Sequence, residues 1–282
     1  MTIKARPFLK WVGGKTQLLP ELIKRIPKTW NRETDLYFEP FVGAGALFWE
    51  LQPKCAYLSD ANAELFNTWL AFEKCYVEDF FEHLRELASH YIVKPEEMYY
   101  AIRNLTYAEC LEACLQCSAS RTVFLNKAGF NGLYRVNKAG KFNVPWGQNP
   151  NATIFDEENL TACRDAIHAC DLTLERCDFE SAPHPAPGSL WYADPPYMPI
   201  SKTSNFTAYT SGGFTYVDQL RLVIYAAKLK AEGVHVLLSQ AAEEGLIDQY
   251  RRCGFTCDLV QARRSVNSVG TGRGKVGEYI IY

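Results

Sequence analysis

The sequence of 282 residues has no apolar run of the roughly 18 residues that a membrane-spanning helix requires. Its basic N-terminal segment, MTIKARPFLKWVGGKT, lacks the apolar stretch and cleavage site of a secretory signal. Internal repeats and low-complexity tracts are missing as well. Hydrophobic residues make up 48% and charged residues 22%, which is ordinary for a globular chain. We therefore expect a globular protein of the cytoplasm that has no membrane contact and acts as a monomer.

Positive charge is not in excess, because the formal net charge is −2. A global electrostatic attraction to nucleic acid is therefore excluded. Acidic residues are nevertheless missing from three stretches, residues 1–20, 113–155 and 259–277. A solvated loop explains any one of them, but three together favour a face that binds phosphates. The basic residues of the three stretches include Lys4, Arg6, Lys10 and Lys15, then Arg121, Lys127, Arg135, Lys138 and Lys141, then Arg263, Arg264, Arg273 and Lys275.

Ten cysteines are present, but no other feature is typical of a secreted, disulfide-stabilised protein. We therefore expect all ten thiols to be free. Cys110, Cys114 and Cys117 form C-x3-C-x2-C, which resembles the iron–sulfur motif of radical S-adenosylmethionine enzymes. Cluster ligands usually lie on a loop, whereas the surrounding segment YAECLEACLQCSAS predicts a helix. We expect these side chains to lie on a buried helix face and to hold no metal.

The order of apolar segments predicts an α/β protein with a doubly wound sheet. Residues 35–40 read as a strand that enters the glycine turn FVGAG, and residues 55–60 read as a second strand before a helix from Asn62. Helical periodicity covers 66–118, and 121–150 has the composition of a hairpin or loop. We expect one sheet domain, residues 1–62 and 156–282, interrupted by a mainly helical insertion, residues 63–155, with a basic hairpin near 128–146. The later strands are expected at 171–176, 189–194, 234–239, 255–260 and 278–282, with a helix at 217–233.

The turn Phe41-Val-Gly43-Ala-Gly45 is of the nucleotide-binding type, because glycines let the backbone approach a ligand closely. The third glycine of a dinucleotide fingerprint is missing. Asp60 ends the next strand, where an acid holds ribose hydroxyls. A tight turn with a helix-capping aspartate is the alternative interpretation. A phosphate loop of the NTPase type is excluded, because Leu9 stands where G-x-x-x-x-G-K-T requires glycine.

The segment Asp194-Pro195-Pro196-Tyr197 follows a strand at its carboxyl end, where doubly wound folds place their active sites. The exocyclic amine of adenine is a poor nucleophile, because its lone pair is delocalised into the ring. Hydrogen bonds from this amine to the Asp194 carboxylate and the Pro195 carbonyl would localise the lone pair. The two prolines stiffen the loop, and Tyr197 offers a ring for stacking a base rotated out of the duplex. The four residues are therefore our candidates for catalysis.

The order F-x-G-x-G, basic insertion, D-P-P-Y resembles the alpha group of amino-methyltransferases. The whole chain is similar to the Dam-type DNA adenine methyltransferases of the D12 class. The resemblance implies a Rossmann-like methyltransferase sheet, an inserted target-recognition domain and S-adenosylmethionine as methyl donor. It implies cofactor contacts from Trp11, Lys15, Asp60 and Asp194, and packing of the cofactor adenine by Cys177-Asp178-Phe179. Together with the aromatic and glycine positions of the turn, the cofactor-binding candidates are Trp11, Lys15, Phe41, Gly43, Gly45, Asp60, Asp178, Phe179 and Asp194.

The insertion carries a second match to this family, in N-K, F-N-G-L-Y-R and F-N-V-P-W-G. The resemblance implies that this hairpin enters the major groove of double-stranded DNA and reads GATC. Arg135 falls on the family arginine that contacts a guanine, and Lys10 on a lysine that contacts the outer guanine. Phe130, Trp146 and residues 128–129 depart from the usual pattern, which leaves the flanking-sequence preference in doubt. The DNA-binding candidates are Lys10, Lys127, Phe130, Asn131, Leu133, Arg135, Lys138, Lys141 and Pro145.

Two alternatives remain open. One is the same chemistry on RNA, protein glutamine or a small-molecule amine, although such enzymes tend to carry N-P-P-Y or S-P-P-Y. The other is a DNA-binding relative that has lost catalysis, against which the intact Asp194 and Tyr197 argue. The sequence does not distinguish a partner of a restriction system from a phage enzyme or a repair methylase.

Overall fold

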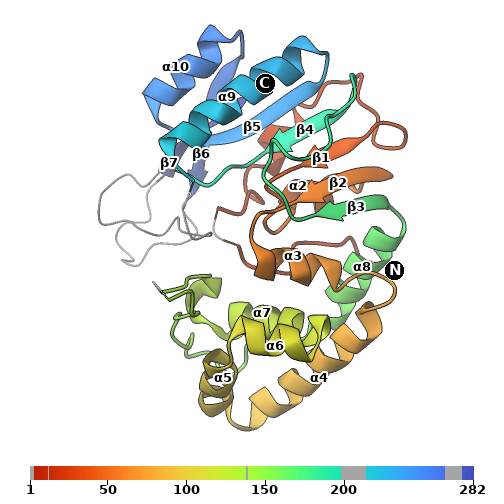
Figure 1. The fold of residues 1–282 in the computed structure, drawn as a ribbon, viewed down its shortest axis with the longest axis vertical. Coiled ribbons are helices and arrows are strands. Elements are labelled where there is room, and N and C mark those ends of the chain that lie inside the picture. Colours follow the sequence, from red (N-terminus) through yellow and green to blue (C-terminus); the bar gives the residue numbers. More distant parts are fainter. Residues whose placement is uncertain (1–2, 12, 138, 198–213, 264–274) are drawn as a thin grey trace.

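The computed structural model describes residues 3–11, 13–137, 139–197, 214–263 and 275–282 (Figure 1). In this part of the chain a seven-stranded sheet has the order β3-β2-β1-β4-β5-β7-β6. The first five of these strands are parallel, and β7 lies antiparallel between β5 and β6. The predicted Rossmann-like methyltransferase fold is confirmed. The strands are β1 (Tyr37–Glu39), β2 (Cys55–Ser59), β3 (Asp171–Glu175), β4 (Leu190–Ala193), β5 (His235–Ala241), β6 (Cys257–Arg263) and β7 (Lys275–Ile281).

Helices cover both faces of the sheet. Since successive strand residues point to opposite faces, each strand contributes side chains to both cores. On β1, Tyr37 belongs to the core beneath one layer of helices and Phe38 to the core beneath the other. The first layer holds α1 (Leu19–Ile23), α2 (Ala46–Leu51), α3 (Ala63–Leu70) and α8 (Glu157–His168). The second layer holds α9 (Tyr216–Ala231) and α10 (Glu244–Arg252), seen at the top of Figure 1. After β3 the chain returns to pair β4 with β1, which creates a switch point between β1 and β4 where ligands bind.

The insertion is helical, as expected, and lies at the opposite end of the molecule from α9 and α10 (Figure 1). It contains α4 (Val77–Val93), α5 (Pro95–Asn104), α6 (Tyr107–Ala113) and α7 (Leu115–Ala128). A short 3-10 helix, η1 (Phe130–Gly132), follows α7. Isolated bridges Gly129–Trp146 and Val136–Phe142 then fold the chain back on itself at the position of the predicted hairpin. Helices α4 and α7 share one apolar core with the sheet, so the division into residues 1–62, 63–155 and 156–282 stays a prediction.

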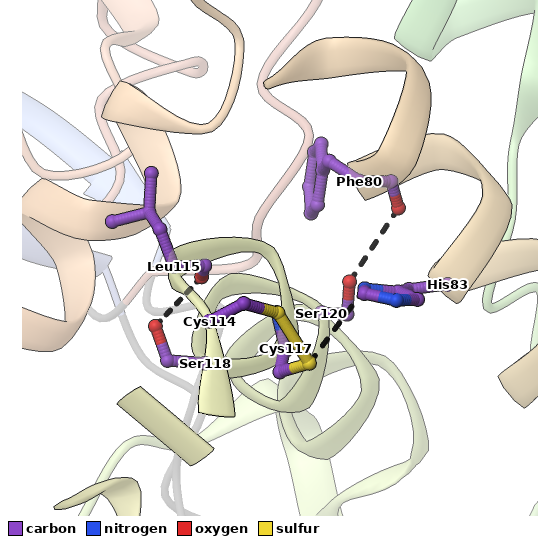
Figure 2. The surroundings of a disulfide bond; sticks show 7 residues. All are labelled: Phe80, His83, Cys114, Leu115, Cys117, Ser118 and Ser120. Carbon is purple, nitrogen blue, oxygen red and sulfur yellow. Dashed lines mark hydrogen bonds between the residues drawn. A yellow bond between two sulfur atoms is a disulfide. The ribbon is translucent and has the colours of Figure 1, made fainter. Parts of the chain in front are cut away.

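The expectation of ten free thiols is wrong for Cys114 and Cys117, which form a disulfide (Figure 2). The predicted single helix is broken at Cys114, whose extended backbone separates α6 from α7. Cys114 caps α7, since its Sγ accepts a hydrogen bond from the Cys117 amide at 3.0 Å. This geometry brings the two Cα atoms within 5.2 Å of each other. His83 Nδ1 lies 3.9 Å from the Cys117 sulfur, and the ligand atoms of His83, Cys114 and Cys117 all lie within 4.8 Å of one another.

The remaining cysteines of the described chain are free. Cys110, the first residue of the C-x3-C-x2-C segment, is buried on α6. Among the described residues, no helix is both long and apolar enough to cross a membrane.

Candidate active site

The glycine turn after β1 is shaped by two glycines with left-handed backbone angles. Gly43 has a φ of +51°, and a Cβ there would lie 3.2 Å from the Trp11 ring. Gly45 has a φ of +67°, and a Cβ there would lie 2.7 Å from the Trp69 ring. Trp69 also donates its indole N–H to the Gly43 carbonyl at 2.9 Å. The two glycines therefore allow aromatic rings to pack against the backbone of the turn.

Asp60 joins this turn to the end of β2. Its carboxylate accepts hydrogen bonds from the Gly43 amide at 3.2 Å and the Asn62 amide at 2.9 Å. Burial raises the pKa of Asp60 to about 6, because the charged form loses its hydration. Asn62, not Asp60, caps α3 by accepting from the Leu65 amide. The capping alternative for Asp60 is therefore wrong, and its carboxylate faces the cavity instead.

Asp194 leaves the carboxyl end of β4 and meets the ammonium group of Lys15. The Lys15 nitrogen lies 2.7 and 2.8 Å from the two Asp194 carboxylate oxygens. It also lies 3.2 Å from a carboxylate oxygen of Glu278 on β7. Burial raises the pKa of Asp194 to about 6, although the Lys15 charge opposes this shift. The pKa of Lys15 is itself raised, because the attraction of the two carboxylates exceeds the cost of burial.

Two contacts fix the Tyr197 side chain, one at its hydroxyl and one at a face of its ring. Its hydroxyl donates a hydrogen bond to Glu278, and its ring lies beneath the Lys15 ammonium, 4.8 Å from the nitrogen to the ring centroid. The loop between Asp194 and Tyr197 is anchored from α9, where the buried Gln219 donates to the Pro196 carbonyl at 3.0 Å. Gln240 on β5 in turn donates to the Gln219 side chain at 2.8 Å. The loop is thereby fixed to two elements of the sheet domain.

A buried carboxyl lies beneath the site on β1. Glu39 is 2% exposed and accepts a hydrogen bond from the Tyr37 hydroxyl at 2.7 Å. Burial raises the pKa of Glu39 well above its usual range, and the negative charge of Asp194 raises it further.

The opposite wall is aromatic. The Phe41 and Phe179 rings lie 5.5 Å apart, centroid to centroid, and the Phe214 ring lies 5.6 Å from Phe41. The Arg221 guanidinium on α9 covers Phe179 and forms ion pairs with Asp178 at 2.8 Å and Asp218 at 2.9 Å. Arg221 thus links α9 to the loop that follows β3.

These groups surround one cavity of about 310 Å³ at the switch point between β1 and β4. The structure brings together every residue that the sequence placed at the cofactor or at catalysis. The cavity is lined, among others, by Trp11, Lys15, Phe41, Gly43, Gly45, Asp60, Asp178, Phe179, Asp194, Pro195, Pro196 and Tyr197.

The DNA-binding candidates lie outside the cavity. Lys10 packs against η1, because a Cβ on Gly132 would lie 2.6 Å from the Lys10 Cβ. The buried Asn126 side chain ties the two segments together, since its amide donates to the carbonyls of Lys10 at 2.7 Å and Gly132 at 2.9 Å. Exposed candidates are Lys10, Phe130, Asn131, Arg135, Lys141 and Pro145, whereas Leu133 and Lys127 are half-buried and Lys138 lies outside the described residues.

Arg135 is held across the hairpin by Asn143. Its guanidinium donates to the Asn143 side-chain oxygen at 2.6 Å and to the Asn143 carbonyl at 3.1 Å. Lys127 is less accessible than expected, and burial lowers the pKa of its ammonium group. Of the two lysines, the exposed Lys141 is better placed for a phosphate than Lys127.

The prediction that three acid-free stretches form one phosphate-binding face is wrong for the buried Arg121, whereas Lys4 and Arg6 are exposed and have acidic partners. Lys4 pairs with Glu50 at 2.7 Å, and Arg6 pairs with Asp156 at 2.7 Å. Arg121 is 3% exposed and pairs with Glu64 at 3.3 Å inside the insertion. Residues far away in the sequence neutralise these charges, so a local count of acids overestimates the basic surface. Most of the third stretch, residues 264–274, lies outside the described residues.

Sequence reasoning missed Glu278, Gln219 and Gln240, which hold residues of the cavity wall in place, and Asn143 in the hairpin. Each lies in an ordinary strand, helix or loop sequence, and none belongs to a motif that we singled out. No local signal marks Glu278, because only the packing of β7 beside β5 brings it to the edge where β4 ends.

Comparison with known proteins agrees with this geometry. The family model described as "D12 class N6 adenine-specific DNA methyltransferase" matches residues 11–265. The chain is similar to "Type II methyltransferase M1.LlaDCHI" of Lactococcus lactis subsp. cremoris, with 37% identity covering 99% of this chain and 95% of the relative. It is also similar to "Type II methyltransferase M.MjaIII" of Methanocaldococcus jannaschii, with 36% identity covering 96% of each chain.

A third relative is "DNA adenine methylase" of Escherichia coli (strain K12), which is 32% identical over 98% of this chain and 95% of its own length. The match to the family model and the likeness to these relatives extend over nearly the whole chain, including the cavity and the hairpin. The protein is therefore an adenine-specific DNA methyltransferase, and its family implies S-adenosylmethionine as methyl donor. The chain belongs to the D12 class of N6 adenine-specific DNA methyltransferases.

Proposed function

We propose that this protein methylates the N6 amine of adenine within GATC in duplex DNA, after the target base has rotated out of the helix. One observation carries the proposal. The Asp194 carboxylate and the Tyr197 ring line the same cavity as the glycine turn and Asp60. A hydrogen-bond acceptor, a stacking ring and a nucleotide-binding turn are thus within reach of one another.

The residues of the cavity fit S-adenosylmethionine. Asp60 lines the cavity and is oriented by its two amide contacts, so its carboxylate is placed to accept hydrogen bonds from ribose hydroxyls. Phe41 and Phe179 offer aromatic faces to the adenine ring. Trp11 lies against Gly43, where its ring would contact a sulfonium by a cation–π interaction. When bound, the cofactor supplies a methyl group made electrophilic by the positive sulfur.

The adenine amine needs acceptors for its two N–H groups. The Asp194 carboxylate and the Pro195 carbonyl are adjacent in the loop that Gln219 anchors. By accepting hydrogen bonds from both N–H groups, these two acceptors would draw the nitrogen toward tetrahedral geometry and direct its lone pair at the methyl group. Tyr197 would stack on the base, which makes a position outside the duplex energetically acceptable.

Recognition of GATC rests on the hairpin. Arg135 is exposed, and an arginine donating to O6 and N7 of guanine is the commonest specific base contact. Asn143 holds this guanidinium and restricts its direction. Lys10 packs against η1, which contains Phe130 and Asn131, and these exposed residues complete the surface that we assign to the major groove.

Transfer of labelled methyl groups from S-adenosylmethionine tests the proposal. Equal amounts of GATC duplex, duplexes with one base pair of the site replaced, single-stranded RNA and protein are incubated with the enzyme. We expect label only in the GATC duplex, recovered as N6-methyladenine after digestion to nucleosides. Label in RNA or protein would identify the alternative substrate class, and no label in any of them would remove methylation of GATC from the proposal. Equal labelling of the altered duplexes would remove GATC from the proposal.

A further inference from the structure

Glu278 joins two groups of the active site, although it comes from the last strand of the sheet. It lies on β7, opposite Ala241 of β5, and is 9% exposed. Its carboxylate accepts the hydrogen bond of the Tyr197 hydroxyl and lies 3.2 Å from the Lys15 nitrogen. The buried carboxylate thus has a cation and a phenol hydroxyl as partners, and these contacts restrict the positions of all three groups.

Lys15 is shared between two carboxylates. Its nitrogen contacts Asp194 at 2.7 Å and Glu278 at 3.2 Å, and it donates to the Gly13 carbonyl at 2.6 Å. The same ammonium lies over the Tyr197 ring, at 4.8 Å from the centroid. One face of this ring is therefore occupied by the lysine, and only the other face can take a base.

We propose that Glu278 is a positioning residue for the target base, an inference that rests on the function proposed above. By fixing the Tyr197 hydroxyl and drawing Lys15 over one ring face, Glu278 leaves the opposite face for the extruded adenine. By sharing Lys15 with Asp194, it leaves the Asp194 carboxylate able to accept the adenine amine. Glu278 itself touches neither the base nor the methyl group; it acts through Tyr197 and Lys15.

The chain offers a matched control. Tyr279, the next residue on β7, donates its hydroxyl to Glu244 of α10 at 2.7 Å. This pair has the same chemistry, but among the described residues neither of its members forms a hydrogen bond or ion pair with Lys15 or Tyr197, as Glu278 does. Both Glu244→Gln and Glu278→Gln remove a negative charge from a tyrosine–carboxylate hydrogen bond. The first does so away from the active site, and the second does so next to Lys15 and Tyr197.

The experiment combines fluorescence and methyl transfer on the full chain. The target adenine of a GATC duplex is replaced by 2-aminopurine, whose emission rises when it leaves the base stack. Wild type, Glu278→Gln, Tyr197→Phe, the double variant and Glu244→Gln are compared with saturating S-adenosylmethionine. Thermal melting and cofactor binding are measured for each protein. The methylation rate is measured on the unmodified duplex.

We expect Glu278→Gln to lower the emission rise and kcat by about tenfold, since a charge-assisted hydrogen bond becomes a neutral one. Tyr197→Phe should lose about as much, and the double variant no more than the worse single variant, because the two groups act as a unit. Cofactor binding and melting should stay near wild type, and Glu244→Gln should match wild type throughout.

Wild-type emission and kcat in Glu278→Gln would overturn the positioning role, as would losses that simply multiply in the double variant. A fall in melting temperature and cofactor affinity that accounts for the whole loss would mark Glu278 as merely structural. If Glu278→Gln does not fold, Tyr197→Phe decides alone: a wild-type emission rise in that variant overturns the inference. Failure of the proposed function looks different, because wild type itself would then neither methylate the duplex nor raise the emission.

Discussion

The cavity at the switch point and the hairpin near residues 128–146 are built in different ways. In the cavity, Lys15, Asp194 and Glu278 are each at most 20% exposed at the side chain and contact one another from three separate elements. In the hairpin, Arg135 is exposed and its described side-chain hydrogen bonds go to one residue, Asn143, of the opposite arm. Buried groups are fixed by what surrounds them, whereas exposed groups are fixed by a few local contacts. On the function that we propose, catalysis depends on the packed sheet, whereas recognition of the DNA sequence depends on a small number of side chains that can change independently.

The largest effect is expected in the cavity, from Asp194→Ala. The adenine amine loses its main acceptor, and kcat should fall by on the order of 10²–10³, as when a preorganised partner of the transition state is removed. Because Lys15 then keeps Glu278 as its one carboxylate partner among the described residues, weaker cofactor binding should accompany the loss. Steady-state methyl transfer and circular dichroism of the variant measure both the rate and the fold. A folded variant with near-normal turnover would remove Asp194 from catalysis.

Arg135→Ala tests the hairpin, which is the second region of the comparison. Loss of the guanine contact should reduce discrimination at one base pair by about 1–3 kcal/mol, so that near-cognate duplexes become methylated. Competition between cognate and singly substituted duplexes measures this ratio. The turnover on GATC should change far less than in Asp194→Ala, because the hairpin lies outside the cavity.

Lys141→Ala is the control for Arg135, since both side chains are exposed on the same hairpin. A phosphate contact carries no sequence information, so binding should weaken alike for all duplexes. The slope of log affinity against log salt should fall by about one unit. An Arg135→Ala enzyme that showed this behaviour, with unchanged preference, would mean that the reading residue lies elsewhere.

The cavity and the hairpin should also differ in how their functions depend on pH. The pKa values of Asp194 and Asp60 are raised to about 6, so both groups take up protons at a higher pH than ordinary aspartates do. A protonated carboxyl is a poor acceptor for the adenine amine or a ribose hydroxyl. The rate of methyl transfer should therefore be flat above neutrality and fall as pH drops through about 6, at least tenfold per pH unit well below the pKa.

Discrimination between cognate and altered duplexes should stay constant over the same range, since an arginine keeps its charge. Melting curves at each pH exclude unfolding as the cause of the fall. A rate that stays constant down to pH values near 4, the ordinary range of aspartate, would contradict the assigned environment of Asp194.

The smallest effect is expected from the disulfide. Cys114→Ser should lower the free energy of unfolding by about 2 kcal/mol or less, because the bond closes a very short loop. Methyl transfer should be unchanged, since no residue of α6 or α7 lines the cavity. Urea unfolding and methyl-transfer rates measure the two quantities.

We further expect no stoichiometric zinc or iron in the purified protein and full activity in the presence of a chelator. Elemental analysis and the visible spectrum test this expectation. Stoichiometric iron with an absorption band lost in Cys110→Ser would show that the cysteines hold a cluster.

The sequence predicted those parts of the molecule in which neighbouring residues carry the signal. Strands ending in Asp60 and Asp194 could be recognised locally, and the carboxyl ends of parallel strands meet at one edge of a sheet. Glu278 and Gln219 could not be found in this way, because only tertiary packing brings β7 and α9 to that edge. Arg121 appeared basic and available for the same reason: its partner Glu64 lies on another helix.

The break at Cys114 was missed because cysteine is not a usual helix-capping residue and the segment has continuous helical periodicity. Motifs identify groups that act together locally, whereas long-range contacts decide which charges are exposed and which are neutralised.

The central claim is that the packed cavity methylates adenine N6 at a site chosen by the hairpin. The most direct test is to incubate wild-type enzyme and S-adenosylmethionine with a randomised duplex library and to map N6-methyladenine at single-base resolution. We expect methylation at the adenine of GATC, with the methylation of every other sequence far below it. Methylation at a different amine, or at adenines without any preferred surrounding sequence, would contradict it.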